Sequence, residues 1–524
     1  MNLLARLRPL ISQPREIVLQ GYSHDAFWRR SIVLFGAIYA LVLVALGAAF
    51  AFYGTNVLVP VSGLLAVIAL LIVWVLPESS NPPTKWMRRL LFGFLIALMF
   101  WPDYLAFDFP GLPWITALRL FGVPLAATFF ISLSVSPAFR RELADLLKTT
   151  SLTNVFLLLF IATAALSILY SRTPSASAEK FTIAVLYWFV VFYVSVWLFS
   201  KPGTLKTLAY LFWAFAVFTS VIGLQEWRLQ AIPWAGHIPS FLAVDDPVIQ
   251  TILSAKARST TGIYRLQSKF NTPLSFAEFL AFSTPFILYF AVFGRSFFVK
   301  LAAAASLPLI FQSILRTDSR LGATGFFMSF LLFLVAWGVI RWRQRRESVF
   351  GPAITIAYPF VAVGFLVATF FVGRLRAMVW GTKAQSFSSQ AREAQWDSGI
   401  PRLLSQPWGY GMGEGGGVLG YRNLAGVLTI DSHYLAALLE FGILGFLIYA
   451  CFFLSSLVYG SFYIFKANNP EHLLIIPCMI LVSIFVVEKS VFAQIENHAL
   501  AYAAVGAICA MCWRIRKDSE GASA

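Results

Sequence analysis

The chain is built from a succession of long apolar segments, most of them close to the length that crosses a lipid bilayer as a helix. About 20 apolar residues span the hydrocarbon core. The segments that meet or approach this length are Ile32–Gly54, Val57–Leu76, Leu90–Trp101, Trp114–Val135, Thr153–Tyr170, Phe181–Phe199, Leu205–Leu224, Pro273–Phe293, Val299–Leu315, Leu321–Ile340, Ala353–Val372, Phe441–Phe465, Leu473–Val487 and Ala499–Trp513. With 59% of its 524 residues hydrophobic and only 12% charged, the chain has too little polar surface for a soluble globule of its size. We therefore predict an all-α, polytopic integral membrane protein with about 12–14 transmembrane helices.

The positions of the basic residues test this count independently. Clusters of Lys and Arg fall in every second connection: Lys85, Arg88 and Arg89; Arg140, Arg141 and Lys148; Lys201 and Lys206; Arg295 and Lys300; Arg341–Glu347; and Lys466. Cytoplasmic loops carry such an excess in membrane proteins. The alternation predicts that both termini are cytoplasmic. The N-terminal tail, residues 1–31, has no short apolar core followed by a cleavage site, so we do not expect a cleaved signal peptide.

Two connections are much longer than the others and are predicted to lie on the outer face. They run from Gln225 to Thr272 and from Gly373 to Ser432, far beyond the roughly 12–15 residues of an ordinary loop. Both are rich in Trp, Pro and Gly, which favours ordered structure over a floppy linker. The predicted organisation is a tail at 1–31, membrane helices at 32–224, an outer loop at 225–272, helices at 273–372, a second outer loop at 373–440, helices at 441–513 and a tail at 514–524.

The outer face carries arginines that the topology rule does not explain, because long loops do not set topology. Arg265 stands in the first long loop, and the turn "LRTDSRLGATGFF" places Arg316 and Arg320 on either side of Asp318. Boundary arginines commonly extend to lipid headgroups. Alternatively, converging planar guanidinium groups would bind a phosphate or pyrophosphate in two-pronged fashion. The remaining basic residues of the long loops are Lys256, Arg258, Lys269, Arg374, Arg376, Lys383, Arg392, Arg402 and Arg422.

One carboxylate falls inside an apolar segment near the outer boundary. Asn271-Thr272-Pro273 is a conventional helix start, and Glu278 then lies one to two turns inside the membrane. Intramembrane carboxylates are costly and often functional. We expect Glu278 to be a structural partner of an outer-face arginine rather than a catalytic group.

His433 stands where a glycine-rich polar segment, "QPWGYGMGEGGGVLGYRN", gives way to an apolar run. Asp431 and Ser432 suit the N-cap of a helix that begins near His433, and Glu440 would share its face two turns later. A histidine in this position is more often a capping or interface residue. If it acts chemically, it suits a general base near neutral pH. No second ligand stands at metal-binding spacing around it, so we expect no metal and no cofactor. The four cysteines lie in apolar segments and are interpreted as packing residues.

These motifs combine into a known pattern. In order, "RLQSKFNTPLSFAEFLA", "LRTDSRLGATG", "PWGYGMG" and "DSHYLAALLEFGILGF", separated by membrane segments, resemble the O-antigen ligase superfamily from about Arg265 to Phe446. This superfamily includes O-antigen ligases and exopolysaccharide polymerases. The resemblance implies a GT-C-like fold whose core begins with the helices of residues 273–372, in a bacterial inner membrane with the site on the periplasmic side. The extra N-terminal segments and the Lys-Phe-Asn-Thr sequence before Pro273 depart from the usual ligase pattern.

The resemblance also implies a reaction. The donor would be a glycan on undecaprenyl pyrophosphate, and transfer would invert the anomeric carbon without a metal. Arg265 and Arg320 would hold the pyrophosphate, with Arg316 an added candidate by proximity, and His433 would activate the acceptor hydroxyl. Asp318, Glu278, Asp431 and Glu440 would support the site. The acceptor would be a growing polysaccharide or lipid A core. Membrane lipids and other polysaccharide-assembly proteins would be further partners, and nucleic acid would have no role.

Three functions remain open at this stage. The long outer loops and extended N-terminal half favour a polymerase that joins lipid-linked repeat units into exopolysaccharide, capsule or O-antigen. A ligase that transfers finished glycan to lipid A core is a close second. A transporter or flippase of lipid-linked sugars is more remote, because such proteins place charged residues deep in several helices, whereas this chain keeps most of its charge at the two faces.

Overall fold

The fold was analysed in a computed structural model, which describes residues 36, 68–69, 71–79, 81–109, 114–254, 262–344, 347, 349–373, 376, 386–422, 428–467 and 469–521. The N-terminal tail, all but residue 36 of the first predicted crossing, most of the second crossing, and Lys256, Arg258, Arg374 and Lys383 lie outside these ranges. Contacts divide the chain into two compact units. One comprises residues 1–87, 110–112 and 127–142, and the larger comprises 88–109, 113–126 and 143–524. The candidate site lies wholly in the larger unit.

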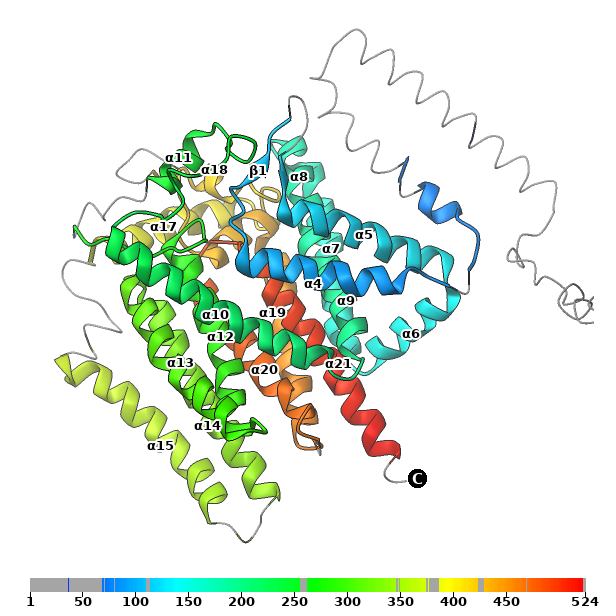
Figure 1. Ribbon diagram of the computed structural model, residues 1–524. Helices are drawn as coiled ribbons and strands as arrows, with labels where there is room; N and C mark the ends of the chain where they lie inside the picture. Colours follow the sequence, from blue (N-terminus) through cyan, green and yellow to red (C-terminus); the bar gives the residue numbers. More distant parts are fainter. Residues whose placement is uncertain are drawn as a thin grey trace, which may run out of the picture. The chain divides into compact units, whose positions relative to one another are not determined.

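Helices make up almost all of the regular secondary structure that the structure describes (Figure 1). The long helices are α4 (Thr84–Phe100), α5 (Ala117–Val135), α6 (Pro137–Lys148), α7 (Ser151–Ser167), α8 (Pro174–Ala184), α9 (Val190–Phe199), α10 (Thr204–Leu229), α12 (Pro273–Phe293), α13 (Phe297–Arg316), α14 (Arg320–Gln344), α15 (Phe350–Phe371), α17 (Ser386–Ser405), α19 (His433–Ile464), α20 (Ile475–Lys489) and α21 (His498–Gly521). Shorter helices are η2 (Ile168–Tyr170), η3 (Val185–Phe189), α11 (Pro247–Leu253), α18 (Gly415–Leu419) and η5 (His472–Leu474). The one described sheet pairs β1 (Ala106–Phe107) antiparallel with β2 (Ile115–Thr116), with Ala106 opposite Thr116.

Eleven described helical segments are long and apolar enough to cross a membrane. Each coincides with one of the predicted crossings, and α4, with 17 residues, occupies the shortest of them. This agreement confirms the prediction of an all-α polytopic membrane protein.

Burial separates the central helices from the peripheral ones. In the apolar window of α21, 94% of residues are buried inside the protein, and the figure is 83% for α12 and 78% for the η5–α20 segment. In α15 it is only 6%. A helix that is apolar all round and surrounded by protein belongs to the core, whereas an equally apolar helix with free faces is solvated by lipid. Helices α12, α20 and α21 therefore form the centre on which the site is built.

Local sequence explains where the central helices begin. The Thr272 hydroxyl accepts a hydrogen bond from the Ser275 N–H, and Pro273 occupies the first helical position of α12. Ser432 caps α19 in the same way by accepting from the Leu435 N–H at 3.3 Å. Both starts agree with the sequence prediction.

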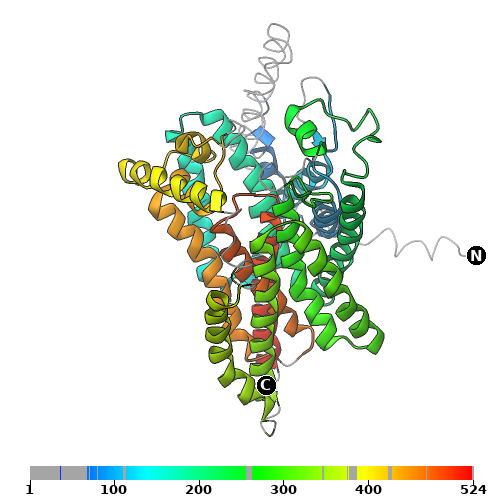
Figure 2. The ribbon, with the colours of Figure 1, turned by 90° about the vertical axis from the view of Figure 1, so that its left-hand side faces the viewer.

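Helices α11, α17 and α18 lie at one end of the larger unit, and the C-terminus lies at the other (Figures 1 and 2). We call the first the loop end and the second the opposite end. Helices α12, α14, α19 and α21 begin at the loop end, whereas α10 and α13 begin at the opposite end.

Candidate active site at the loop end

Four membrane helices place their N-terminal turns side by side at the loop end. The imidazoles of His433, which opens α19, and His498, which opens α21, approach within 3.4 Å. The Asn497 amide donates to the Ser275 carbonyl in the first turn of α12 at 2.8 Å. Gly322, in the first turn of α14, lies so close to α12 that an added Cβ would stand 2.6 Å from the Ala277 Cβ. Each helix N-terminus carries a partial positive charge and unsatisfied N–H groups, so their convergence creates an environment suited to an anion.

The two histidines form a hydrogen-bonded pair between Nε2 atoms. His433 is partly exposed, whereas His498 is fully buried. The Trp188 ring stacks on His498 at 5.0 Å, and Phe485 meets it edge-on at 5.1 Å. This packing holds His498 in place, and the hydrogen bond in turn fixes the orientation of His433. Across the described ranges, no group of three or more His, Cys, Asp or Glu side chains is arranged to hold a metal ion.

Glu278 lies in the second turn of α12 and pairs with a lysine. Its carboxylate contacts the Lys489 ammonium at 2.7 Å and accepts from the Asn497 amide at 3.0 Å. The Glu278 and Lys489 side chains are both 0% exposed. A carboxylate buried among apolar helices requires a charged partner. The described ion pair of Glu278 is therefore with a lysine of α20 and not with the outer-face arginine expected from the sequence.

The three candidate arginines lie around that turn. The Arg265 Nε donates to the Thr317 carbonyl at 2.8 Å, and the Leu266 N–H donates to the Arg316 carbonyl at 3.1 Å. These bonds attach the end of the first long loop to the α13–α14 turn. The Arg316 guanidinium lies 3.6 Å from the centroid of the Trp227 ring, and Arg320 is the first residue of α14. Asp318 has φ of +50°, the left-handed conformation that a tight turn requires.

The arginine turn and the histidine pair are joined through the first two turns of α12. Gly322, two residues after Arg320, packs on Ala277, and the neighbouring Glu278 binds Asn497, which precedes His498. The structure therefore places the Arg265, Arg316 and Arg320 group and His433 at the same end of adjoining helices. They come from segments far apart in the sequence.

Asp431 and Glu440 hold the surroundings of His433 in place. The Asp431 N–H donates to Gln395 on α17 at 2.9 Å, and the Gln395 amide donates back to the Asp431 carboxylate at 3.2 Å. Burial raises the pKa of Asp431, and the charge of Arg392 opposes that rise. Glu440 accepts hydrogen bonds from the backbone of Gly413 and Gly415. These two hydrogen bonds tie Glu440 to the glycine-rich segment.

The glycine-rich segment fits into a break in α19. The helix is interrupted at Gly442, which has φ of +71° and ψ of −176°. The Tyr410 N–H donates to the Leu439 carbonyl at 2.8 Å, and the Ile443 N–H donates to the Pro407 carbonyl at 3.0 Å. On its other side, the segment is bound to α7 by the bond from the Met412 N–H to Ser167 at 3.1 Å. The segment is a hydrogen-bonded support for the turns that carry His433, and it turns tightly at Gly409, Gly411 and Gly413, which all have positive φ.

Several polar residues of the site were not anticipated. His498 and Lys489 were missed, as were the groups that position the end of the first long loop. There, Glu226 accepts from the Tyr264 hydroxyl at 2.9 Å and from the Ser268 N–H at 2.6 Å. Lys269 lies 3.6 Å from Glu496, and burial lowers the pKa of this lysine while raising that of the glutamate. The sequence signal that could have indicated the Glu496, Asn497 and His498 side chains was the polar run "QIENH", which immediately precedes an apolar segment.

Comparison with known proteins assigns part of this region to a family. Residues 304–450 match the family model described as O-Antigen ligase, a little over a quarter of the chain. The matched segment includes the arginine turn, the glycine-rich segment and His433. None of the curated proteins compared with the chain matches it. The match confirms the predicted relation to the O-antigen ligase superfamily, and it supports a membrane glycosyltransferase of the ligase or polymerase type.

Proposed function

We propose that this protein, in which residues 304–450 match the O-antigen ligase family model, transfers a glycan from undecaprenyl pyrophosphate to a sugar hydroxyl at the outer face of the bacterial inner membrane. Polymerisation of repeat units of an exopolysaccharide, capsule or O-antigen is the leading assignment. One observation carries the proposal. The His433–His498 pair and the α13–α14 turn that holds Arg316 and Arg320 both lie at the N-terminal ends of the same group of helices. A base and an anion site therefore share one end of the membrane domain.

The arginines and helix ends would bind the pyrophosphate. When the bond between the anomeric carbon and the phosphate oxygen breaks, its electron pair leaves with the pyrophosphate, and negative charge grows there. Fixed guanidinium groups and helix N-termini stabilise such charge without reorganising. Arg265 is held by the Thr317 carbonyl and Arg316 by the Trp227 ring, so both are oriented before substrate binds. Arg320 adds its charge at the first position of α14.

His433 would be the general base. The acceptor oxygen attacks the anomeric carbon from the side opposite the pyrophosphate, which inverts the centre, and the acceptor proton passes to His433. If the His433 Nε2–H donates to the Nε2 of His498, then the Nδ1 of His433 keeps a lone pair for that proton. His498 is thus a positioning residue that selects the tautomer.

An apolar groove is suited to the polyprenyl tail. A cavity of about 400 Å³ lies between α14 and α19, with α20 contributing the third side, and its lining includes Leu332, Val339, Leu457 and Met479. The same two helices begin at Arg320 and His433. A lipid whose pyrophosphate lies between these residues could therefore extend its chain along α20 toward the groove.

The experiment is release of polyprenyl pyrophosphate by the purified full chain from a synthetic polyprenyl-pyrophosphate oligosaccharide. We expect His433→Ala to lower kcat by about 100-fold or more, the usual contribution of a general base. Arg320→Ala should lower kcat/KM by a similar factor. His237→Ala is the matched control, because His237 is exposed in the loop between α10 and α11. Wild-type turnover in His433→Ala protein would refute the assignment of the base.

Ligase activity is the second candidate, favoured by the description of the matched family. Deletion of the gene separates the two. Loss of polymer with accumulation of single lipid-linked repeats would support the polymerase, whereas intact lipid-linked polymer that is not transferred to lipid A core would support the ligase.

A further inference from the structure

A second polar cavity lies at the opposite end of the larger unit, far along the helices from the histidine pair. Its volume is about 310 Å³. It is enclosed by the start of α10, the connection between α12 and α13, and the segment before η5. The distribution of basic residues predicts that this end faces the cytoplasm. The cavity therefore lies at the level of the inner-leaflet headgroups.

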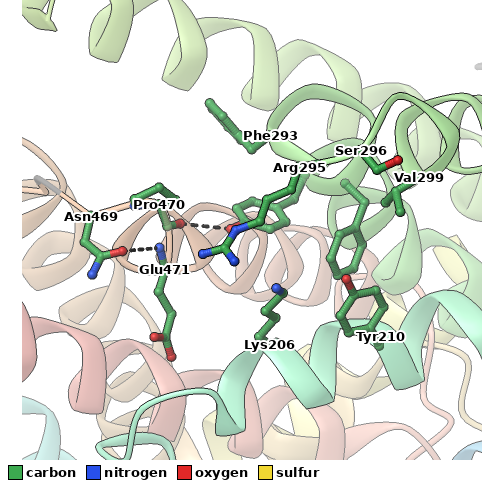
Figure 3. Close-up of a pocket in the computed structure, with 12 residues that line it drawn as sticks. Lys206, Tyr210, Phe293, Arg295, Ser296, Val299, Asn469, Pro470 and Glu471 are labelled. Carbon is green, nitrogen blue, oxygen red and sulfur yellow. Dashed lines mark hydrogen bonds between the residues drawn. The ribbon is translucent and has the colours of Figure 1, made fainter.

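Two cations project into this cavity from different elements. Lys206 rises from the first turn of α10, and Arg295 reaches over from the α12–α13 connection, so that their charged ends point toward one another (Figure 3). Within the part of the chain that the structure describes, no carboxylate forms an ion pair with either. Like charges that face one another in a partly enclosed space repel, and an anion between them relieves that repulsion.

The nearby carboxylate is already engaged elsewhere. Glu471 lines the cavity, but its side chain points away from Arg295 (Figure 3). The Arg514 guanidinium donates to both Glu471 carboxylate oxygens, at 2.8 and 3.1 Å, and the Gly203 N–H donates to one of them at 2.7 Å. This carboxylate is thus neutralised from outside the cavity, and the charge that remains for a ligand is that of Lys206 and Arg295.

The rest of the lining suits a lipid. Tyr210 stacks on Phe290 with ring centroids 4.3 Å apart, and together with Phe293 they form an aromatic wall. Beside the cavity, Phe297 and Phe298 are 72% and 79% exposed at the start of α13, where they would meet acyl chains. Aromatic residues at this depth commonly mark the membrane interface. A soluble anion would gain nothing from these apolar surfaces.

From this arrangement we infer that the cavity binds the phosphate of an anionic phospholipid of the cytoplasmic leaflet, between Lys206 and Arg295. Basic residues on the cytoplasmic face are expected from membrane topology alone, whether or not they line a pocket. This pair differs from them because an enclosed volume, two converging cations and an aromatic wall coincide at one place. The site is independent of the proposed transferase reaction.

The test is lipid titration of the purified full chain in mild detergent, with bound lipid counted by native mass spectrometry. We expect one high-affinity site for dioleoyl phosphatidylglycerol and at least tenfold weaker binding of dioleoyl phosphatidylcholine. Lys206→Gln with Arg295→Gln should weaken phosphatidylglycerol binding at least tenfold, and Lys206→Arg with Arg295→Lys should retain most of it. Lys466→Gln with Lys517→Gln removes the same charge outside the cavity lining and should change the affinity less than twofold.

Three results would overturn the inference. The first is wild-type affinity in the Lys206→Gln, Arg295→Gln protein, provided that it elutes as a monodisperse species. The second is an equal loss in the Lys466→Gln, Lys517→Gln control, which would indicate general surface charge. The third is displacement of the lipid by glycerol 3-phosphate at equal concentration, because the cavity would then recognise a soluble phosphate ester rather than a phospholipid.

Discussion

At the scale of single residues, the site depends on a hydrogen bond between two imidazoles. His433 faces partly outward, and its Nε2 contacts a second histidine that is enclosed by aromatic rings. An imidazole has one donor and one acceptor when neutral, so the partner of one nitrogen determines what the other nitrogen can do. A proton acceptor that is held in one tautomer and one orientation loses less entropy when it reacts.

The effect of this pairing can be measured by substitution of His498. His498→Phe keeps an aromatic ring between Trp188 and Phe485 but removes the hydrogen-bond acceptor for His433. We expect kcat to fall about tenfold, which corresponds to the free energy of one neutral hydrogen bond. KM should stay within twofold. His498→Gln restores an amide near the former Nε2 and should recover part of kcat. If the Phe and Gln variants have the same kcat and the same pH–rate profile as wild type, His498 serves packing alone.

At the scale of elements, the break in α19 is the feature on which the position of His433 depends. The backbone of Gly442 lies in a region that is open almost only to glycine. A Cβ at this position would also collide with the Pro407 carbonyl oxygen and lie 2.5 Å from the Trp408 carbonyl carbon. The glycine-rich segment and the helix break therefore fit together only when position 442 has no side chain.

We accordingly expect Gly442→Ala to destabilise the protein by about 1–3 kcal/mol from backbone strain, with an added loss from displacement of the Pro407–Gly409 turn. Activity should fall more than stability at temperatures where the variant is still folded, because the turns that carry His433 would shift. Gly416→Ala is the control, since Gly416 lies in α18 with open space around an added Cβ. Thermal unfolding and turnover measured on both variants test this. Equal behaviour of the two variants would contradict the role of the break.

At the scale of the whole larger unit, the two ends differ in the polar groups that they carry. The loop end gathers helix N-termini, three arginines and the histidine pair, whereas the opposite end carries basic residues such as Lys206, Arg295 and Lys466, whose positions predict a cytoplasmic location. A transferase that used a periplasmic donor would need its arginines and its base together at the loop end. Their placement together is the geometric condition for the proposed reaction.

Cysteine labelling tests this orientation. Gln390 on α17 and Lys517 near the end of α21 are both exposed, at the loop end and the opposite end respectively. In a background in which the four native cysteines are replaced, a membrane-impermeant maleimide added to spheroplasts should label Gln390→Cys, and it should label Lys517→Cys only after lysis. The reverse pattern would place the arginines and His433 on the cytoplasmic side and exclude a periplasmic transfer reaction.

Local sequence determined the features that depend on near neighbours in the chain. Apolar segment length predicted the eleven candidate spans because a bilayer imposes one length on every helix that crosses it. Capping chemistry predicted the starts of α12 and α19, because an N-cap is decided within four residues. The order of the motifs around Arg320 and His433 indicated a resemblance to the O-antigen ligase superfamily before any contact was known, and residues 304–450 match that family's model.

Only the tertiary structure decided which polar groups meet. His433 and His498 are separated by 65 residues, and Asn497 and Glu278 by 219. Helical periodicity states which face a side chain occupies on its own helix, but it does not state which other helix covers that face. The Glu278 carboxylate therefore pairs with Lys489 rather than with an arginine, because the packing of α12 on α20 brings the Lys489 ammonium next to it. In an apolar interior, where an unpaired charge is costly, such pairings are set by helix packing.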